Sequence, residues 1–168
     1  MIEFQPLRED DLPLVRDWLE RPHVREWWRD SIDQSIAEYK QAMGGLDPSE
    51  HYLIVHDARA IGMIETYLVS DHPEWEVIVE VGEGVAGVDL LIGEEDVTGH
   101  GLGPRVLEAF VNDVVFANPG THACVAAVDE GNRRSWRAFE QAGFRYVRDV
   151  EEDGRPHRLM RLDRRYAQ

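Results

Sequence analysis

A glycine-rich turn between a strand-like run and a helix-like run constrains the fold of this chain most. The turn, Gly99-His100-Gly101-Leu102-Gly103-Pro104, follows the apolar run Val88–Ile92 and precedes the run Arg105–Phe116. Glycine tolerates positive φ and lets main-chain amides come close to a ligand. A helix start adds unpaired amides and a partial positive charge, and Pro104 fits a first helical turn. The order strand, glycine turn, helix therefore predicts a cradle for a pyrophosphate.

Two common nucleotide-binding motifs do not fit this turn. The dinucleotide fingerprint is Gly-x-Gly-x-x-Gly near the start of a βαβ array, with an acidic residue about 20 positions later. Here the spacing is Gly-x-Gly-x-Gly, past the middle of the chain. A P-loop needs Gly-Lys-Ser/Thr, which does not follow. The turn therefore predicts a different phosphate-bearing ligand.

Length and composition favour one globular domain over residues 1–168. No run approaches the roughly 20 apolar residues that a membrane span requires, and the stretch Met1–Phe4 lacks the basic region of a secretory signal. Cys124 is the single cysteine, so one chain cannot form a disulfide or a cysteine-based zinc site. We expect a cytoplasmic protein without a membrane partner, acting as a monomer or homodimer.

The charge balance is strongly acidic. Asp and Glu number 33 against 18 Lys and Arg, for a formal net charge of −15. Such a chain repels nucleic acid and anionic membranes and attracts cations. Two explanations remain open: general solubility, or a polycationic small-molecule substrate bound by acids that line a cleft.

The first fifty residues predict an edge strand followed by helices. Apolar spacing places Leu12, Val15, Trp18 and Leu19 on one helical face, capped by Asp10 or Asp11. The other expected elements are an edge strand over Ile2–Leu7, a short helical piece over His23–Trp28, and a helix around Ile36–Met43 capped by Ser31 or Asp33 and ended by Gly44-Gly45.

The rest of the chain predicts a sheet interrupted by two helices. The expected elements are a hairpin of His51–His56 and Ile61–Val69, a polar loop Ser70–Glu74, strands Val77–Val81, Val85–Ile92 and Ala123–Val128, a helix Asn132–Ala142 ended by Gly143, and a hairpin of Phe144–Val150 and Arg158–Leu162. The right-handed crossover rule makes the strand at Ala123 parallel to the strand at Val88. The fold class is α/β, of mixed α+β character.

Residues Val88–Phe144 resemble the acetyl-CoA-binding half of the GCN5-related N-acetyltransferase (GNAT) superfamily. The family loop Gln/Arg-x-x-Gly-x-Gly/Ala matches Thr98, Gly101 and Gly103, with Thr98 in place of Gln or Arg. A second family signature matches the stretch from Asn132 to Gly143-Phe144. The resemblance implies a GNAT fold, with a mixed, mostly antiparallel, splayed central sheet flanked by helices. It also implies acetyl-CoA as cosubstrate and no metal.

The resemblance implies a set of acetyl-CoA contacts on three segments. They are Leu90, Leu91, Ile92, Thr98, Gly99, His100, Gly101, Leu102, Gly103, Pro104, Asn132 and Phe139. Amides near Leu90 and Leu91 would polarise the thioester carbonyl. Asn132 serves as a helix N-cap, a pantetheine contact, or both. Phe139 departs from the Tyr of many members, so protonation of the leaving thiolate falls to water, another group or none.

A second resemblance concerns the acyl acceptor. Trp18-Leu19, Pro22-His23-Val24, Glu26-Trp27-Trp28, Tyr67 and Gly87-Val88-Asp89 resemble bacterial aminoglycoside 6′-N-acetyltransferases. Tryptophans can stack on sugar rings or pack in a core, and we expect one of Trp27 and Trp28 in each role. Acids can bind substrate ammonium groups or simply face water. The expected substrate contacts are Trp27, Trp28, Tyr67, Trp75, Asp129, Glu130 and Asp153.

Asp89 is the candidate catalytic base. A primary amine is mostly protonated at neutral pH, so a carboxylate can hold the ammonium and then accept its proton as the amine attacks. Asp89 stands on the strand ahead of the glycine turn and matches the catalytic Asp of the family it resembles. The alternative is a strand-edge Asp that faces water. Cys124, expected in a buried strand, is an unsuitable acyl carrier, so we expect direct transfer in a ternary complex.

Three alternative functions remain. Siderophore-pathway lysine N-acyltransferases share the fold, and Leu90-Leu91-Ile92-Gly93 resembles them, but they typically carry His where this chain has Asp89. Ribosomal-protein N-terminal acetyltransferases are a second alternative. A non-catalytic acyl-CoA-binding module is a third, and it predicts a cradle without a working base.

Overall fold

The computed structural model describes residues 1–165 and divides into two compact units. The first unit holds Met1–Thr66 with Asp89–His100, and the second holds Tyr67–Val88 with the chain from Gly101 onward. Strands β3 (Arg59–Leu68) and β4 (Val85–Ile92) each have residues in both units. By hydrogen bonding, the seven strands follow the order β1-β2-β3-β4-β5-β7-β6. The division of residues 1–168 into a single domain stays a prediction.

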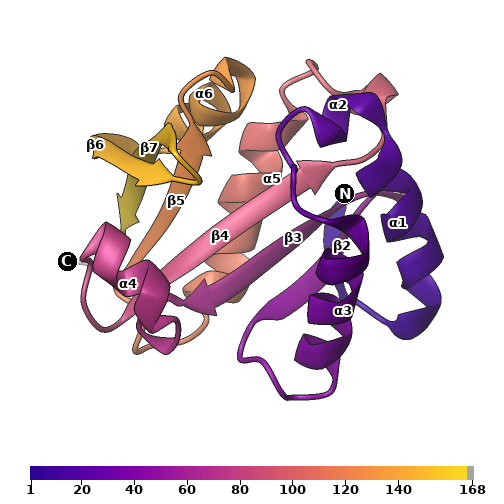
Figure 1. Cartoon of the computed structure of the whole chain (residues 1–168). Helices are drawn as coiled ribbons and strands as arrows, with labels where there is room; N and C mark the ends of the chain where they lie inside the picture. Colours follow the sequence, from indigo (N-terminus) through magenta and orange to yellow (C-terminus); the bar gives the residue numbers. More distant parts are fainter. Residues whose placement is uncertain (166–168) are drawn as a thin grey trace. The chain divides into compact units, whose positions relative to one another are not determined.

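The first unit places short helices around an antiparallel sheet (Figure 1). Besides its parts of β3 and β4, its elements are β1 (Ile2–Pro6), the 3-10 turn η1 (Glu9–Asp11), α1 (Leu12–Glu20), α2 (Pro22–Arg25), α3 (Ile32–Met43), β2 (Glu50–His56) and the 3-10 turn η3 (Glu95–Val97).

The hairpin of β2 and β3 follows its predicted position. Its strands pair antiparallel from Glu50 opposite Thr66 to His56 opposite Arg59. The connecting residues Asp57 and Ala58 both have positive φ, 49° and 66°, as a tight two-residue hairpin turn requires. Strand β1 pairs antiparallel with β2 and stands first in the strand order, so the expected edge strand is confirmed.

The first unit has its own apolar core. The predicted face of α1, with Leu12, Val15, Trp18 and Leu19, is buried. It packs with residues from α3, β2, β3 and β4, among them Ile36, Tyr39, Leu53, Met63 and Leu91. The helix at α1 forms because these apolar residues recur at helical spacing and gain burial against the strands.

Two predicted helix starts have different outcomes. The Ser31 hydroxyl accepts a hydrogen bond from the amide of Gln34 at 3.3 Å, which confirms Ser31 as a cap of α3. The Asp11 side chain does not cap α1: its carboxylate accepts from the amide of Arg8 at 2.9 Å and closes the preceding 3-10 turn. The short second helix ends at Arg25, earlier than the predicted Trp28.

The second unit contains the rest of the sheet and three helices (Figure 1). Besides its parts of β3 and β4, its elements are the 3-10 turn η2 (Val69–Asp71), α4 (Pro73–Val79), α5 (Leu102–Phe110), the π-helical segment η4 (Val111–Val115), β5 (Ala123–Asp129), α6 (Arg133–Gln141), β6 (Arg145–Glu152) and β7 (Arg155–Asp163).

The predicted strand Val77–Val81 is wrong, because Val77–Val79 lie in α4, which also begins inside the predicted polar loop. Pro73 occupies the first turn, where its fixed φ suits a helix and its missing N–H costs nothing. Trp75 and Val79, four residues apart, pack against the apolar core of this unit, while Val77 is 74% exposed. A run of β-branched residues favours a strand, but the two positions that pack on the core are four residues apart, which is the spacing of a helix.

Strand pairing in the second unit confirms the predicted fold class. β4 and β5 are parallel, with Val85 opposite Ala123 and Gly87 opposite Val125, as the crossover rule requires. β5 pairs antiparallel with β7, and β7 with β6. Cys124 is the second residue of β5 and is fully buried. The sheet is therefore mixed and mostly antiparallel.

The two long helices of this unit differ in their ends from the predicted ranges. α5 begins at Leu102, inside the glycine turn, and gives way to a π-helical segment after Phe110. In α6 the Asn132 side chain accepts from the amide of Ser135, so the predicted N-cap is confirmed. Gly143 follows this helix with φ +101°, the conformation expected of a glycine at a helix end. Within residues 1–165, none of these helices is long and apolar enough to cross a membrane.

Candidate active site

The burial of β4 changes at the candidate base. Residues Val85–Val88 are all buried, whereas Asp89 is half-buried. The pairing of β4 with β5 covers Val85–Gly87, so Asp89 comes two residues after it. A carboxylate at this position avoids the full cost of desolvation that a buried charge would carry. The strand thus changes from a buried apolar segment to one that carries an ionisable group.

The three residues after Asp89 were predicted to bind acetyl-CoA. Leu91 is buried in the core of the first unit, and Leu90 and Ile92 are half-buried. The strand ends where Gly93 and Glu94 donate their amides to the carbonyl of Ile61, at 2.8 and 3.1 Å. Their contact with acetyl-CoA stays a prediction.

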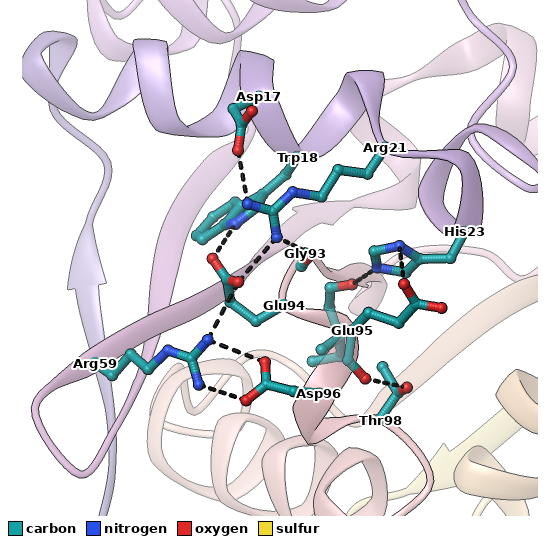
Figure 2. A network of polar contacts seen from close by, with 11 residues as sticks. Asp17, Trp18, Arg21, His23, Arg59, Gly93, Glu94, Glu95, Asp96 and Thr98 are labelled. Carbon is teal, nitrogen blue, oxygen red and sulfur yellow. Dashed lines mark hydrogen bonds and ion pairs between the residues drawn. The ribbon is translucent and has the colours of Figure 1, made fainter.

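Side chains of α2 and of the residue before it bind the carbonyls at the end of β4 (Figure 2). Arg21 Nη1 donates to the carbonyl of Gly93 at 2.8 Å, and His23 Nε2 lies 3.0 Å from the carbonyl of Ile92. Because a carbonyl only accepts, this contact is a hydrogen bond when Nε2 of His23 carries the proton. Trp18 lies so close to Gly93 that a Cβ there would overlap its ring. The end of β4 therefore depends on residues about 70 positions earlier.

Glu94 is the centre of this polar network. Its carboxylate accepts from Trp18 Nε1 at 3.0 Å, from Arg21 Nη1 at 2.8 Å and from Arg59 Nη2 at 3.2 Å. Arg59 also pairs with Asp96, at 2.8 and 3.0 Å. The hydrogen bond from Trp18 and the arginine beside it hold the pKa of Glu94 below its ordinary value, against the opposing effect of burial. The carboxylate is thus ionised and accepts hydrogen bonds from three donors.

The glycine turn has the backbone geometry of an anion cradle. Gly99 and Gly101 have φ values of +77° and +74°, which side chains rarely adopt. Gly99, His100 and Gly101 are exposed. The Thr98 hydroxyl donates to the carbonyl of Glu95 at 2.7 Å, which fixes the start of the turn.

Helix α5 follows Gly101 with amides that its N-cap leaves uncapped. Gly101 occupies the N-cap position and has no side chain to accept from the first turn. Gly103 faces α6, where a Cβ would lie 3.4 Å from that of Ala138, and Pro104 sits in the first turn. Leu102 is buried and anchors the helix start. Exposed amides and a helix N-terminus fit the pyrophosphate of CoA.

The two predicted contacts on α6 lie in different surroundings. Asn132 is half-buried, and its side-chain oxygen caps the helix. Phe139 is 2% exposed and packs edge to face on Phe144, with ring centroids 5.0 Å apart. Phe139 accordingly contributes to packing, and a contact between this ring and acetyl-CoA stays a prediction.

The two adjacent tryptophans have different neighbours. Trp28 is half-buried and packs against the core of the first unit. Trp27 is also half-buried, and the guanidinium of Arg29 lies 5.7 Å from its ring centroid. Trp28 is thus the one that packs on the core. That Trp27 faces a substrate stays a prediction.

Two further aromatic candidates lie together in the second unit. Tyr67 and Trp75 both pack, half-buried, against the core formed by residues such as Val85. The Tyr67 ring lies against Gly87, where a Cβ would overlap it, and meets His72 edge to face at 5.0 Å. The glycine before the candidate base is therefore required by a neighbouring aromatic ring.

The predicted acids of the second unit lie at the end of β5, beside β7, and in the β6–β7 turn. Asp129 pairs with Arg155 at 3.0 Å and accepts from the amide of Gly131 at 2.9 Å. Burial opposes ionisation of Asp129, but the amide and the arginine outweigh it and hold its pKa below the ordinary value. Glu130 and Asp153 are exposed. Binding of substrate by these three acids stays a prediction.

Sequence reasoning missed the network around Glu94. Its members, Trp18, Arg21, Arg59 and Asp96, come from three separate segments, and no local pattern links these segments. The one available signal was Gly93, a glycine directly after a strand, which marks close approach of another group. Within residues 1–165, no group of three or more His, Cys, Asp or Glu side chains could hold a metal ion.

Comparison with known proteins gives a consistent family. The sequence model of the acetyltransferase (GNAT) domain matches residues 8–152. The chain is 28% identical over 150 residues to an aminoglycoside N(6′)-acetyltransferase type 1 of Klebsiella pneumoniae, across 85% of this chain and 73% of the relative.

Solved structures agree. The aminoglycoside acetyltransferase AAC(6′)-Ib in complex with coenzyme A and kanamycin has a TM-score of 0.87 and 26% identity, covering 98% of this chain and 95% of that chain. The same enzyme with ribostamycin and coenzyme A has a TM-score of 0.87 and 25% identity, covering 97% and 93%. Because the family match spans well over half of its length, the chain belongs to the GNAT family of acetyltransferases.

Proposed function

We propose that this protein transfers an acetyl group from acetyl-CoA to the 6′-amino group of aminoglycosides, in the cytoplasm and within a ternary complex. One observation carries the proposal. β4 is buried up to Val88, becomes half-exposed at the carboxylate of Asp89, and leads through residues 93–98 into a glycine turn that precedes an uncapped helix start. A base and a donor cradle on one continuous segment are what amine acetylation requires.

The residues of this segment divide the chemistry between them. Amides of the glycine turn and of the start of α5 bind the pyrophosphate of the donor, and the amides near Leu90 and Leu91 polarise the thioester carbonyl. Asp89 holds the substrate ammonium and takes one proton from it. The amine nitrogen then bonds to the acetyl carbon as the carbon–sulfur bond breaks, and the sulfur leaves with the electron pair. The nitrogen gives its second proton to solvent, which leaves the neutral amide. Phe139 has no proton to give, so solvent or another group protonates the thiolate.

The acceptor preference rests on charge and aromatic surface. An aminoglycoside carries several ammonium groups, and a chain with a net charge of −15 attracts such a polycation over long range. Glu130 and Asp153 are exposed carboxylates, and Trp27 offers a half-buried ring for stacking against a sugar. The relatives in solved structures bind kanamycin and ribostamycin, which supports the same substrate class for this chain.

A substrate panel tests the proposal directly. Acetyl-CoA is mixed with the protein and a kanamycin-type drug, its analogue with 6′-hydroxyl in place of 6′-amine, a hydroxylysine, and a peptide amine, and release of free thiol is followed. We expect thiol release with the 6′-amino drug and none with the 6′-hydroxyl analogue. Turnover of hydroxylysine or the peptide alone would contradict the proposal. Binding of CoA without turnover of any amine would instead favour a non-catalytic acyl-CoA-binding module.

A further inference from the structure

The end of β4 is bound from outside the sheet by one short segment of chain. Trp18 of α1, Arg21 between the helices and His23 of α2 lie within six residues of each other. Between them they contact the Ile92 carbonyl, the Gly93 carbonyl and the Glu94 side chain. Three consecutive positions of the strand end are therefore fixed by one helix junction (Figure 2).

Glu94 links α1 and β3 at the end of β4 through hydrogen bonds. It accepts from Trp18 of α1, from Arg21 directly after that helix, and from Arg59 of β3, at distances between 2.8 and 3.2 Å. Its side chain is 17% exposed, so water screens these charge-assisted hydrogen bonds only partly. A carboxylate with three donors from two elements has one orientation open to it.

Hydrogen bonds hold the segment from Glu94 to Thr98, which leads into the glycine turn. Arg59 holds Asp96 as well as Glu94, on both sides of residue 95. The carbonyl of Glu94 accepts from the amide of Val97 at 3.3 Å. The carbonyl of Glu95 accepts from both the amide and the hydroxyl of Thr98, at 3.0 and 2.7 Å. The next residues, Gly99 and His100, are exposed and begin the glycine turn.

We propose that Glu94 is a positioning residue for the CoA-binding turn, which it holds through Trp18, Arg21 and Arg59 without touching the ligand itself. The inference rests on the proposed function only in taking the glycine turn as the pyrophosphate site. Displacement of aligned amides by about 1 Å is enough to cost much of their interaction with a bound group. The network thus sets affinity for the donor, while the chemistry stays with Asp89.

Titration calorimetry with free CoA, together with steady-state kinetics, tests this role. Glu94→Gln keeps the shape but removes the charge, and in either orientation its amide N–H₂ faces a donor, the Trp18 ring nitrogen or the two arginines. We expect its Kd for CoA and its KM for acetyl-CoA to rise on the order of tenfold, with kcat at saturation within about threefold of the parent. Asp96→Asn, at an exposed position, removes one anchor only, and we expect a rise of about threefold.

Asp17→Asn is the matched control. Asp17 pairs with the far side of the Arg21 guanidinium at 2.7 Å and does not contact the strand end. We expect its Kd for CoA to stay within about twofold of the parent. Melting temperature is recorded for every variant, so that a loss of stability can be separated from a loss of donor affinity.

Two outcomes separate this inference from the proposed function. If Glu94→Gln and Asp96→Asn bind CoA like the parent, whatever their melting temperatures, Glu94 is merely structural and the inference is overturned, while aminoglycoside acetylation is untouched. If the parent acetylates no aminoglycoside but both variants lose CoA affinity in the expected order, the proposed function fails and the positioning role stands.

Discussion

The two halves of β4 are built on different principles. Residues Val85–Val88 are buried, pair with β5, and accommodate the Tyr67 ring at Gly87. In the second half Leu91 is buried and the other three residues are half-buried, and the side chains of Arg21 and His23 bind the carbonyls at its end. Apolar packing fixes the first half, and oriented polar contacts fix the second. The strand therefore has a first half held by packing and an end held by hydrogen bonds, next to the residues that lead to the glycine turn.

The largest expected effect is on kcat, for a substitution of Asp89, the first residue after the apolar half of β4. Asp89→Asn keeps the size of the side chain but cannot accept a proton, so we expect kcat to fall on the order of 10²-fold or more. Affinity for CoA, measured by calorimetry, should stay within about twofold. Asp33→Asn, an exposed partner of Arg16, serves as the control. Parent-like turnover by Asp89→Asn would place the base elsewhere.

Substituting a glycine in the first half of β4 and the glycine directly after the second half should separate packing from positioning. Gly87→Ala and Gly93→Ala each drive a methyl group into an aromatic ring, Tyr67 and Trp18 respectively. We expect each to lower the free energy of unfolding by about 3 kcal/mol in urea denaturation. Only Gly93→Ala should also raise KM for acetyl-CoA, because it displaces the segment that leads to the glycine turn. Gly44→Ala, where the nearest atom lies 3.5 Å away, should be neutral, and equal KM values for both β4 variants would contradict the comparison.

The polar half should be the more sensitive to acid. The pKa of Glu94 lies below its ordinary value of 4.5. A lowered folded-state pKa contributes stability above the unfolded pKa, and this contribution is lost as pH falls through the folded pKa. We expect the parent to exceed Glu94→Gln by about 2 kcal/mol in free energy of unfolding at pH 7. This difference should shrink steadily below pH 4.5, whereas Glu20→Gln, at an exposed position, should show no such trend.

The smallest expected effects compare two helix caps, one in each unit. Ser31→Ala and Asn132→Ala each remove a side-chain acceptor from a helix start. Thermal unfolding should show a loss of about 1 kcal/mol for each. If Asn132 also contacts pantetheine, its replacement should raise KM for acetyl-CoA about fivefold, the worth of one hydrogen bond. An unchanged KM for Asn132→Ala would leave this residue as a cap alone.

Local patterns predicted most of the fold because its signals lie within single elements. The buried face of α1, the hairpin of β2 and β3, the cap at Ser31 and the glycine after α6 each follow from a few neighbouring residues. The strand predicted at Val77–Val81 was wrong because β-branched residues outweighed Pro73, whose place at a helix start was the better signal.

The candidate site could be predicted only along one stretch of chain. The glycine turn and Asp89 are consecutive features, so their order alone identified them. The contacts of Glu94 bring together residues between 35 and 76 positions apart, and such pairs depend on how helices and strands pack. The ion pair of Asp129 with Arg155 has the same origin. Sequence reasoning named Asp129 as a substrate acid without seeing that an arginine accompanies it.

Cys124 gives the molecule a built-in reporter. It is the single cysteine of the chain and is buried in β5, so it should not react with a thiol reagent in the native state. Colour developed during turnover would therefore come from released CoA alone. Slow labelling of Cys124 without substrate would measure how often β5 becomes accessible through local or global opening. One reagent can thus measure both the rate of the reaction and the rate at which the fold opens.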